Sequence, residues 1–295
     1  MYCLSATVGS VFQERCIMHN IHEESLGYWS GRAKEYSALH MDEYHSGKSH
    51  CFAQIIRHYL ECLEQPSRYV TADQQTHLND DKDNAQSHTQ PNDSKQTDTQ
   101  KHMQPIRALD VGCGSGFLSM ILAKEGCTVT SVDFSEDMLE QARQNLRAEG
   151  LSNCTFAHMP AQDLRFDDVS FDIAVTRNVL WTLEDADLVY AQMMRVLRPG
   201  GALVNMDAAY GQAFVQADAR GEIPHHRTQT LDQLRTRNHI AHNLTITQVD
   251  RPQWDITQLW DLGAAKVECY RNIGDFCGQQ TMKQDASMFV VAARK

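Results

Sequence analysis

The feature that most constrains the fold is a short apolar segment that runs directly into three closely spaced glycines. Residues 106–111 have the pattern of a β-strand, Gly112, Gly114 and Gly116 follow it, and residues 117–124 have the apolar spacing of a helix. Glycines let a backbone approach a ligand closely and adopt dihedral angles that a side chain would forbid. In a parallel sheet such a turn lies at the carboxyl end of a strand, where nucleotides bind. We therefore expect a nucleotide pocket here.

The remainder of the chain alternates between strand and helix patterns. Strands are expected over 128–133, 153–158, 171–176 and 202–207, helices over 135–149 and 183–197, and in the tail a helix near 256–262 and strands near 266–270 and 288–293. Ser135 offers an N-cap for the first of these helices. Strands that alternate with helices predict an α/β fold with a doubly wound, mostly parallel seven-stranded sheet, and the last two strands predict an antiparallel edge hairpin.

Three regions differ in composition. Residues 1–64 are expected to form N-terminal helices, 65–104 a disordered polar linker or insertion, and 105–295 the ligand-binding domain. The middle region is nearly devoid of large apolar residues, so it cannot bury enough surface to offset the entropy of ordering. We interpret it as a tolerated linker, with a regulatory or lid segment as the alternative, because long surface loops cost little closure entropy.

Composition excludes several classes of protein. No apolar run approaches the ~20 residues that span a bilayer, and residues 1–20 lack the apolar centre of a signal peptide, so a soluble cytoplasmic protein is expected. The net charge of −11 argues against binding to nucleic acid, which draws on clustered basic residues. The nine cysteines show no pair at the spacing of a zinc site and are interpreted as reduced thiols; no metal is expected.

Two details identify the expected nucleotide more closely. A dinucleotide-binding turn needs Gly-x-Gly-x-x-Gly, whereas Phe117 follows the third glycine here. Asp133 ends the second strand, 17 residues past Gly116, where a carboxylate can accept hydrogen bonds from both hydroxyls of a ribose. The alternative role for Asp133 is an N-cap on the following helix.

With these features in order, residues 105–210 resemble the Rossmann-like class I S-adenosylmethionine (SAM) dependent methyltransferases that act on small molecules. The resemblance rests on four segments, at 109–116, 132–139, 171–179 and 196–203. It implies that Asp110 and the backbone of Gly112, Cys113, Gly114 and Gly116 hold the methionine part of SAM. It further implies that Asp133 binds the ribose and that Phe134 and Met138 lie beside the adenine.

The chain departs from the family after the third strand. The family often has an aspartate there that holds the adenine amino group, whereas this chain has Pro160, which cannot make that bond. Adenine recognition then falls to the backbone of Ala161 and the side chain of Gln162, or to Asp163 after a local shift.

The N-terminal region also resembles these enzymes. Residues 28–36 are similar to an aromatic and arginine segment that folds over SAM as a lid, which implies contacts from Tyr28 and Arg32. For Trp29 and Tyr36, packing between helices is the alternative to the lid. Trp181 and Trp254 are expected mainly in the core, and the adjacent His225 and His226 are expected in solvent.

No motif identifies the methyl acceptor. Arg177 and Asn178, at the end of the fourth strand, are the candidates for orienting it, with a carboxylate or other anion on Arg177, which the resemblance also places beside SAM. A small-molecule methyltransferase is favoured over a non-catalytic SAM-binding protein and over an enzyme that uses another nucleotide on the same sheet. The sequence leaves open whether nitrogen, oxygen, sulfur or a metalloid is methylated, and it leaves the oligomeric state open.

Overall fold

The computed structural model describes residues 5–64, 104–221, 229–277 and 288–295, with side chains from Ile21 onward. Two helices come first, α1 (Ser5–His45) and α2 (Lys48–Glu64). The first half of the sheet region then contains β1 (Arg107–Val111), α3 (Phe117–Lys124), β2 (Thr128–Asp133), α4 (Glu136–Ala148), β3 (Cys154–His158) and β4 (Phe171–Arg177). The second half contains the 3₁₀ turn η3 (Leu180–Thr182), α5 (Ala186–Val196), β5 (Leu197–Ala208), α6 (Tyr210–Ala219), α7 (Leu231–Asn243), η4 (Thr245–Gln248), α8 (Gln253–Asp261), β6 (Lys266–Tyr270), α9 (Ile273–Cys277) and β7 (Met288–Arg294).

The seven strands form one sheet in the order β3-β2-β1-β4-β5-β7-β6. The first five strands pair in parallel, and β7 pairs antiparallel with both β5 and β6. The predicted doubly wound sheet with an antiparallel edge hairpin is therefore confirmed. Because strand order reverses direction between β1 and β4, a crevice opens beyond the carboxyl ends of these two strands.

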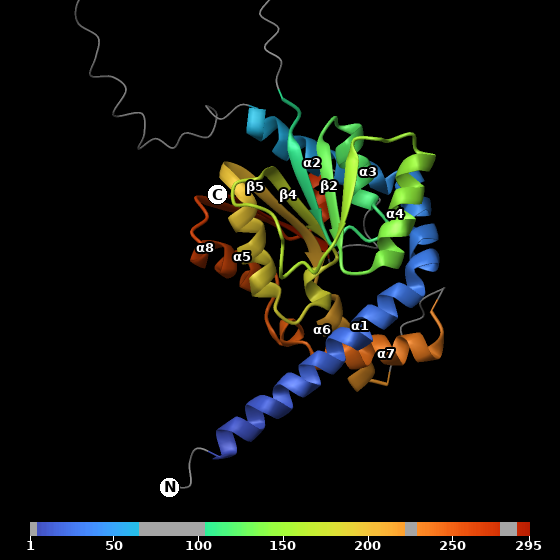
Figure 1. Cartoon of the computed structure of the whole chain (residues 1–295), viewed down its shortest axis with the longest axis vertical. Helices are drawn as coiled ribbons and strands as arrows, with labels where there is room; N and C mark the ends of the chain where they lie inside the picture. The colour runs from blue at the N-terminus through green and yellow to red at the C-terminus, as the bar shows by residue number, and fades with distance from the viewer. Residues whose placement is uncertain (1–4, 65–103, 222–228, 278–287) are drawn as a thin grey trace, which may run out of the picture.

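Alternate side chains of the strands pack into two separate hydrophobic cores, one on each face of the sheet. Ala108, Ile173 and Val175 face a core that includes buried residues of α2 and α3, whereas Leu109 and Ala174 face a second core that includes buried residues of α5. This alternation follows from the two-residue period of a strand. The result is a three-layer molecule in which α2, α3 and α4 cover one face of the sheet and α5 and α8 the other (Figure 1).

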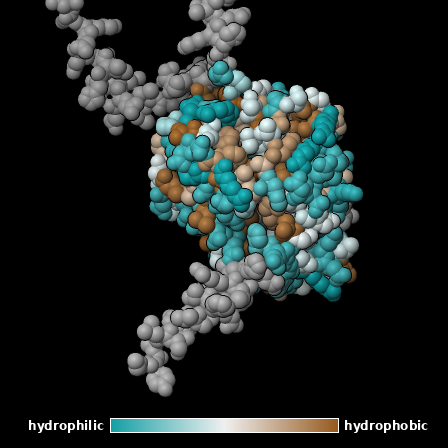
Figure 2. Space-filling model, viewed as in Figure 1, coloured by the Kyte–Doolittle hydropathy of each residue, from teal (hydrophilic) through white to brown (hydrophobic). Residues whose placement is uncertain are grey.

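Helix α1 is the element that closes the edge at which the strands end. It crosses beyond the carboxyl ends of the strands and lies beside α4 and α7 (Figure 1). None of the described helices is both long and apolar enough to cross a bilayer. The face seen in Figure 2 is mostly hydrophilic with scattered hydrophobic residues, as expected for a domain whose apolar surface is buried between layers.

Several elements differ from the sequence prediction. Helix α5 begins at Ala186 rather than at 183, because residues 180–182 form a 3₁₀ turn and Leu183 is extended. Strand β5 begins at Leu197 rather than at 202, because Leu197 pairs with Phe171 before an irregularity in the ladder. Helices α6 and α7 were not predicted. The expectation of nine reduced thiols is wrong at Cys51, which is disulfide-bonded.

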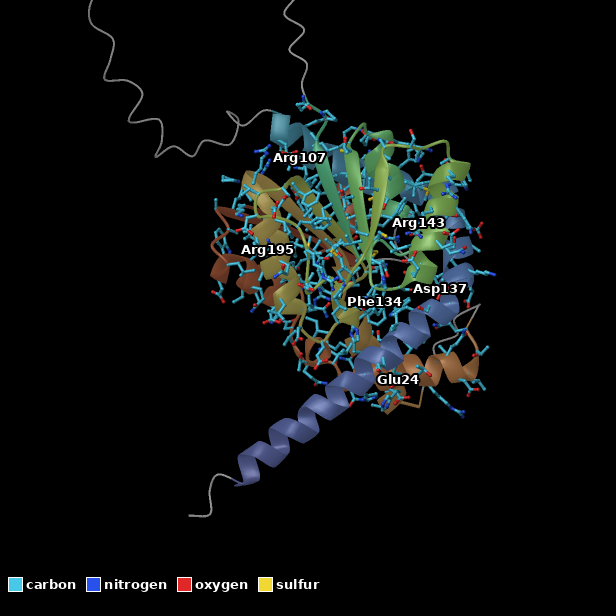
Figure 3. The ribbon with its side chains drawn as sticks, in the orientation of Figure 1. Glu24, Arg107, Phe134, Asp137, Arg143 and Arg195 are labelled. Carbon is cyan, nitrogen blue, oxygen red and sulfur yellow. The ribbon has the colours of Figure 1, made fainter. Side chains whose placement is uncertain are left out.

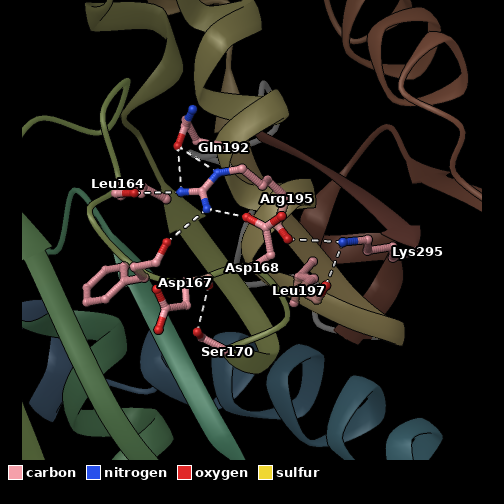
Figure 4. Close-up of polar contacts among 9 residues, drawn as sticks. Leu164, Asp167, Asp168, Ser170, Gln192, Arg195, Leu197 and Lys295 are labelled. Carbon is pink, nitrogen blue, oxygen red and sulfur yellow. Dashed lines mark hydrogen bonds and ion pairs between the residues drawn. The ribbon is translucent and has the colours of Figure 1, made fainter.

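The loop between β3 and β4 is fixed by a single arginine of α5. Arg195 donates to the carbonyl oxygens of Leu164 (2.6 Å) and Phe166 (2.8 Å) and pairs with Asp168 (Figure 4). Lys295 in turn donates to the carbonyl oxygens of Arg195 and Leu197. These contacts hold the loop and Lys295 against α5 and the start of β5.

Candidate functional site

A pocket, here called the glycine-loop pocket, lies at the predicted turn. Eleven of the predicted site residues line it: Asp110, Gly112, Cys113, Gly114, Asp133, Phe134, Met138, Ala161, Gln162, Arg177 and Asn178. Its other described walls come partly from α1, through His22, Trp29, Tyr36 and His40. The structure thus brings together residues from the ends of β1, β2 and β4, and α1 covers them.

The three glycines of the turn have different structural roles. Gly112 has φ +67°, and a Cβ placed on it would lie 2.5 Å from a methyl group of Val179. Gly114 has φ +52° and faces the pocket, with Tyr36 and His40 nearly 4 Å from the same hypothetical atom. Gly116 is the N-cap of α3, and a Cβ there would meet Leu146 at 2.8 Å. Gly116 therefore serves the packing of α3 against α4 and does not line the pocket.

Asp133 combines burial with unused hydrogen-bonding capacity. Its Oδ2 accepts from the backbone N–H of Gly114 at 2.8 Å, and its Oδ1 accepts from that of Ser135 at 2.9 Å. Ser135 itself caps α4, so the alternative role of Asp133 as the cap is not needed. A carboxylate has about four acceptor positions, and the backbone donors leave part of this capacity for a ligand. Burial raises the pKa of Asp133 to about 6, although hydrogen bonds from the backbone of Ser135, Gly114 and Phe134 oppose the rise.

Asp110 lies behind the turn and is almost completely buried. Ser119 Oγ donates to its Oδ2 at 2.6 Å, and Ser119 Oγ also lies 2.8 Å from Ser131 Oγ. Burial raises the pKa of Asp110 to about 7 despite the bond from Ser119. Two buried carboxyl groups thus lie beside the turn, and burial raises the pKa of both toward neutral pH.

The end of the pocket beyond β2 and β3 contains Phe134, Met138, Ala161 and Gln162. Figure 3 shows Phe134 between the strand ends and α1, and its ring lies 6.0 Å from that of His22. Asp163 does not line the pocket, because its side chain is 65% exposed and pairs with Arg165. Of the two alternatives left by Pro160, the structure therefore favours Ala161 and Gln162.

Arg177 occupies the end of β4 as a buried cation. Its Nη2 lies 2.7 and 2.8 Å from the two carboxylate oxygens of Glu43 on α1, and its side chain is only 8% exposed. The guanidinium carbon lies 4.3 Å from the ring centroids of both Phe52 and Phe117. Burial lowers the pKa of Arg177, but Glu43 outweighs burial and raises it, so the residue stays charged. Its Nε and Nη1 have no hydrogen-bond partner among the described residues.

Asn178 follows Arg177 with an unusual backbone. Its φ is +58°, a left-handed conformation that asparagine tolerates better than most residues. Its N–H donates to the carbonyl oxygen of Met206 at 3.0 Å, while its side-chain Oδ1 is buried without a partner in the described part of the chain. This geometry leaves the amide available to a ligand.

A second cavity, here called the aromatic cavity, adjoins the first and lies between α1, α6 and α7. It shares Trp29, Tyr36, His40, Arg177 and Asn178 with the glycine-loop pocket, and its other walls include Tyr28, Arg32, Trp181, Tyr210, Phe214 and Arg237. Tyr28 and Arg32, which the resemblance assigned to the cofactor, thus lie on this cavity and not on the first one. Trp181 is largely buried and also forms part of the wall of this cavity, so it belongs both to the core and to the site.

Sequence reasoning missed His40, Glu43 and Arg237. His40 lies on the wall shared by the two cavities, with Nδ1 2.9 Å from Ser115 Oγ, and burial followed by the charge of Arg177 lowers its pKa well below the usual value. It is therefore neutral. The spacing Trp29, Tyr36, His40 and Glu43 follows one face of a helix and could have indicated a shared wall. The histidines at 225 and 226 lie outside the described residues.

Comparisons with known proteins agree with this geometry. Residues 109–205 match the family model of a methyltransferase domain. A demethylmenaquinone methyltransferase of Clavibacter sepedonicus is 43% identical over 103 residues, which are 33% of this chain and 39% of that protein. An uncharacterized protein of Haemophilus influenzae is 30% identical over 189 residues, 63% of this chain and 66% of that protein. The chain spans less than half the length of the demethylmenaquinone methyltransferase from Clavibacter.

Solved structures give a looser match. Phosphoethanolamine N-methyltransferase 2 of Haemonchus contortus, in complex with SAM, is similar with a TM-score of 0.46 and 18% identity, covering 65% of this chain and 49% of that one. A SAM-dependent methyltransferase of Aquifex aeolicus has a TM-score of 0.43 and 19% identity, covering 64% and 81%. The family match itself spans β1 to β5, which carry the glycine turn, the carboxylate at the end of β2 and the end of β4. Residues 109–205 therefore carry a methyltransferase domain.

Proposed function

We propose that this chain transfers a methyl group from SAM to a small-molecule acceptor, with SAM in the glycine-loop pocket and the acceptor in the aromatic cavity. The observation that supports this most directly is the wall shared by the two cavities, which contains Trp29, Tyr36, His40, Arg177 and Asn178. A reaction in which one group passes between two molecules needs two cavities that meet at one point. The demethylmenaquinone methyltransferases among the relatives favour a small acceptor, although their acceptor is not assigned to this chain.

The residues of the glycine-loop pocket fit SAM. Asp133 has acceptor positions for the two ribose hydroxyls, and Gly114 leaves the space that a side chain would fill. Phe134 and Met138 offer an apolar slot for the adenine, with Gln162 as its polar neighbour. Asp110, hydrogen-bonded to Ser119, lies at the turn where the methionine part would lie.

SAM supplies a methyl group that is already activated by its positively charged sulfur. The protein therefore has to align the acceptor with this methyl group and to exclude water, and alignment of this kind can contribute about 7 to 11 kcal/mol to the lowering of a barrier. Arg177 is a positioning residue, because its pair with Glu43 joins β4 to α1 across the shared wall. The neutral His40 on the same wall can accept the proton of an acceptor that loses one.

We further propose that residues 1–64 act as a lid, because α1 supplies walls to both cavities. Residues 105–295 then form the catalytic domain. The proposed linker at 65–104 lies, apart from its last residue, outside the described residues.

The experiment that tests the function is incubation of the full chain with methyl-labelled SAM and a cell extract, followed by mass spectrometry of labelled products. We expect a labelled small molecule with the wild-type chain, none with Asp133→Ala, and an undiminished yield with Asp163→Ala, a control whose carboxylate is exposed. A melting temperature that rises with S-adenosylhomocysteine but not with NAD would separate this nucleotide from others. Binding of S-adenosylhomocysteine without any labelled product from broad extracts would instead favour a non-catalytic SAM-binding protein.

A further inference from the structure

One cation on the aromatic cavity has no carboxylate partner among the described residues. Arg237 of α7 is only 4% exposed, yet no carboxylate of the described residues lies within ion-pairing distance of it. Its guanidinium donates to neutral amide oxygens, from Nη1 to Gln229 at 3.0 Å and from Nη2 to Asn238 at 3.0 Å. The guanidinium carbon also lies 3.6 Å from the ring centroid of Phe214. Burial of a charge without an opposite charge is costly, which points to a partner that the described residues do not supply.

A second arginine, Arg32, lies in the same corner, and its Nη2 forms an ion pair with Glu35 Oε1 at 3.1 Å. Arg32 Nη1 donates to the hydroxyl oxygen of Tyr28 at 3.0 Å, and Gln229 Nε2 donates to the same oxygen at 2.6 Å. Because Gln229 also binds Arg237, the two arginines are connected through Tyr28 and Gln229. Burial is the main cause that lowers the pKa of Arg237. The positive charge of Arg32 lowers it further, which means that the two cations repel each other.

This corner still has unused donors. Arg32 is 5% exposed, and its Nε has no hydrogen-bond partner among the described residues. Tyr28 accepts two hydrogen bonds, and none of the hydrogen bonds found in the described part of the chain uses its own hydroxyl proton. The guanidinium of Arg237, which has no carboxylate partner among the described residues, and the free Nε of Arg32 in the same corner form a site for an anion, since hydrogen bonds to charged groups are roughly twice as strong as neutral ones.

The rest of the cavity is aromatic. Trp181 lies edge-on to Tyr210 and Phe214, at centroid distances of 5.8 and 5.6 Å, and 6.2 Å from Trp29. The indole Nε1 of Trp181 is buried without a partner in the described residues. Such walls favour a flat apolar body with a polar group at a defined place.

The charges exclude the other ligand that aromatic walls can attract, which is an organic cation. The charged side chains that line the cavity are four cations, Arg32, Lys48, Arg177 and Arg237, and two carboxylates, Asp42 and Glu43. Glu43 is engaged by Arg177. Arg32 is engaged by Glu35. A cationic acceptor would therefore meet the charge of Arg237, which no described carboxylate compensates, whereas an anion would neutralise it.

We propose that the methyl acceptor is a small planar molecule bearing a carboxylate or a phosphate, whose anionic end binds between Arg237 and Arg32 while its flat body lies against Trp181 and Phe214. This inference rests on the proposed function, because it assigns the acceptor to the aromatic cavity. Arg237 and Arg32 line the aromatic cavity but not the glycine-loop pocket, so on this proposal methylation occurs at another atom and the product keeps its negative charge. Arg177, already paired with Glu43, is then not the residue that binds the anion.

A binding experiment tests the subsite directly. The full chain saturated with S-adenosylhomocysteine is titrated calorimetrically with four probes of similar shape: 4-hydroxybenzoate, phenyl phosphate, the neutral 4-hydroxybenzamide and the cation benzyltrimethylammonium. We expect at least one anion to bind about tenfold or more tighter than the amide, and the cation to bind least. The ratio between the two anions distinguishes a carboxylate from a phosphate acceptor.

Variants of Arg237 test whether this residue causes the preference for an anion. Arg237→Gln should remove the advantage of the anion, Arg237→Lys should keep part of it, and Arg235→Gln should keep all of it, since Arg235 is on the same helix but its side chain is 80% exposed. Melting temperatures establish that each variant is folded. An anion preference that survives Arg237→Gln, equal binding of the amide or the cation, or no binding by any probe would overturn the inference.

The charge of the natural product separates this inference from the proposed function. Labelled products from the extract experiment are passed over an anion-exchange resin at neutral pH. A retained product supports both proposals. A labelled product that flows through overturns the anionic acceptor but leaves the methyltransferase intact, whereas the absence of any labelled product while S-adenosylhomocysteine still binds counts against the methyltransferase itself.

Discussion

At the scale of single residues, Asp133 makes binding of the cofactor dependent on pH. Burial raises its pKa to about 6, and the charges around it are those of Asp110 and His158. Only the ionised carboxylate can accept both ribose hydroxyls, so the Kd for S-adenosylhomocysteine should rise about tenfold for each pH unit below 6. Calorimetry between pH 5 and 8 measures this change. A Kd that stays constant over this range would contradict the role of Asp133, and Asp163→Asn should follow the wild-type profile.

Asp110 lies at the proposed SAM site but lowers the stability of the ligand-free protein when it is ionised. Because its pKa is raised to about 7 by burial, its ionised form destabilises the ligand-free protein. The contribution of this group to the free energy of unfolding is full below about pH 4 and is lost as pH rises through 7. We expect Asp110→Asn to raise the free energy of unfolding at pH 8 by roughly 1 to 3 kcal/mol, less than the roughly 4 kcal/mol that the whole rise in pKa represents, because the amide must keep the bond from Ser119.

Thermal unfolding of wild type and Asp110→Asn at pH 5 and at pH 8 checks this expectation. The gain in stability should shrink at pH 5, where Asp110 is already largely protonated. Affinity for S-adenosylhomocysteine should fall at both pH values. A variant that is less stable than wild type at pH 8 would show that the carboxylate stabilises the turn.

At the scale of elements, the turn between β1 and α3 separates glycines needed for packing from one needed for binding. Gly116→Ala should cost about 2 kcal/mol or more, since it combines a φ of +89° with the close approach to Leu146. Gly114→Ala should cost about 1 kcal/mol, because nothing lies closer than 3.8 Å, but it should weaken binding of S-adenosylhomocysteine by tenfold or more. Gly126→Ala, with a φ of +85° in open space, is the control for backbone strain alone.

Denaturant unfolding and calorimetry on the three variants give the comparison. Equal losses of affinity in Gly114→Ala and Gly126→Ala would mean that strain, and not the shape of the pocket, limits binding.

The elements also show which structure the sequence can predict. The helix at 117–124 and the strand at 128–133 match the prediction residue for residue, because the local periodicity and the glycines before the helix agree there. Helix α7 was missed, although Thr230 and Gln233 form a capping box whose spacing is readable. Its apolar residues are few, so the periodicity that identifies a helix is weak. The position of α7 against α1 comes from tertiary contact and is not encoded locally.

At the scale of the molecule, the sequence predicted the part of the site that one continuous run of motifs forms, which is the glycine-loop pocket. It did not predict the aromatic cavity. Residues 110–138 come together through the order of strands alone, whereas the aromatic cavity needs α1 to cross the sheet and meet α7. Tyr28 and Arg32 show what the sequence could not predict. Their helix was expected, but the cavity that they line depends on where that helix lies in the fold. Long-range packing of this kind has no signature in local spacing.

A buried ion network outside both cavities provides a test of whether fold and site are independent. Arg251, between Asp207 of β5 and Asp255 of α8, is buried, with nitrogen–oxygen distances of 3.0 and 2.7 Å, and Tyr190 of α5 donates to Asp255 at 2.7 Å. Burial lowers the pKa of Arg251, but the two aspartates outweigh burial and raise it above the usual value. None of these residues lines either cavity.

Arg251→Met leaves two buried carboxylates without their cation, so it should lower the free energy of unfolding by about 3 to 5 kcal/mol. The triple variant with Asp207→Asn and Asp255→Asn removes those charges and should recover part of the loss, while Arg235→Met, in an exposed pair, should change stability by no more than about 0.5 kcal/mol. Denaturant unfolding measures these differences. In the folded fraction of every variant the Kd for S-adenosylhomocysteine should equal that of wild type, because the network binds α5 and α8 to the sheet on the face that the site does not use. A weakened Kd in a folded Arg251→Met protein would instead mean that this network transmits strain through β5 to the end of β4.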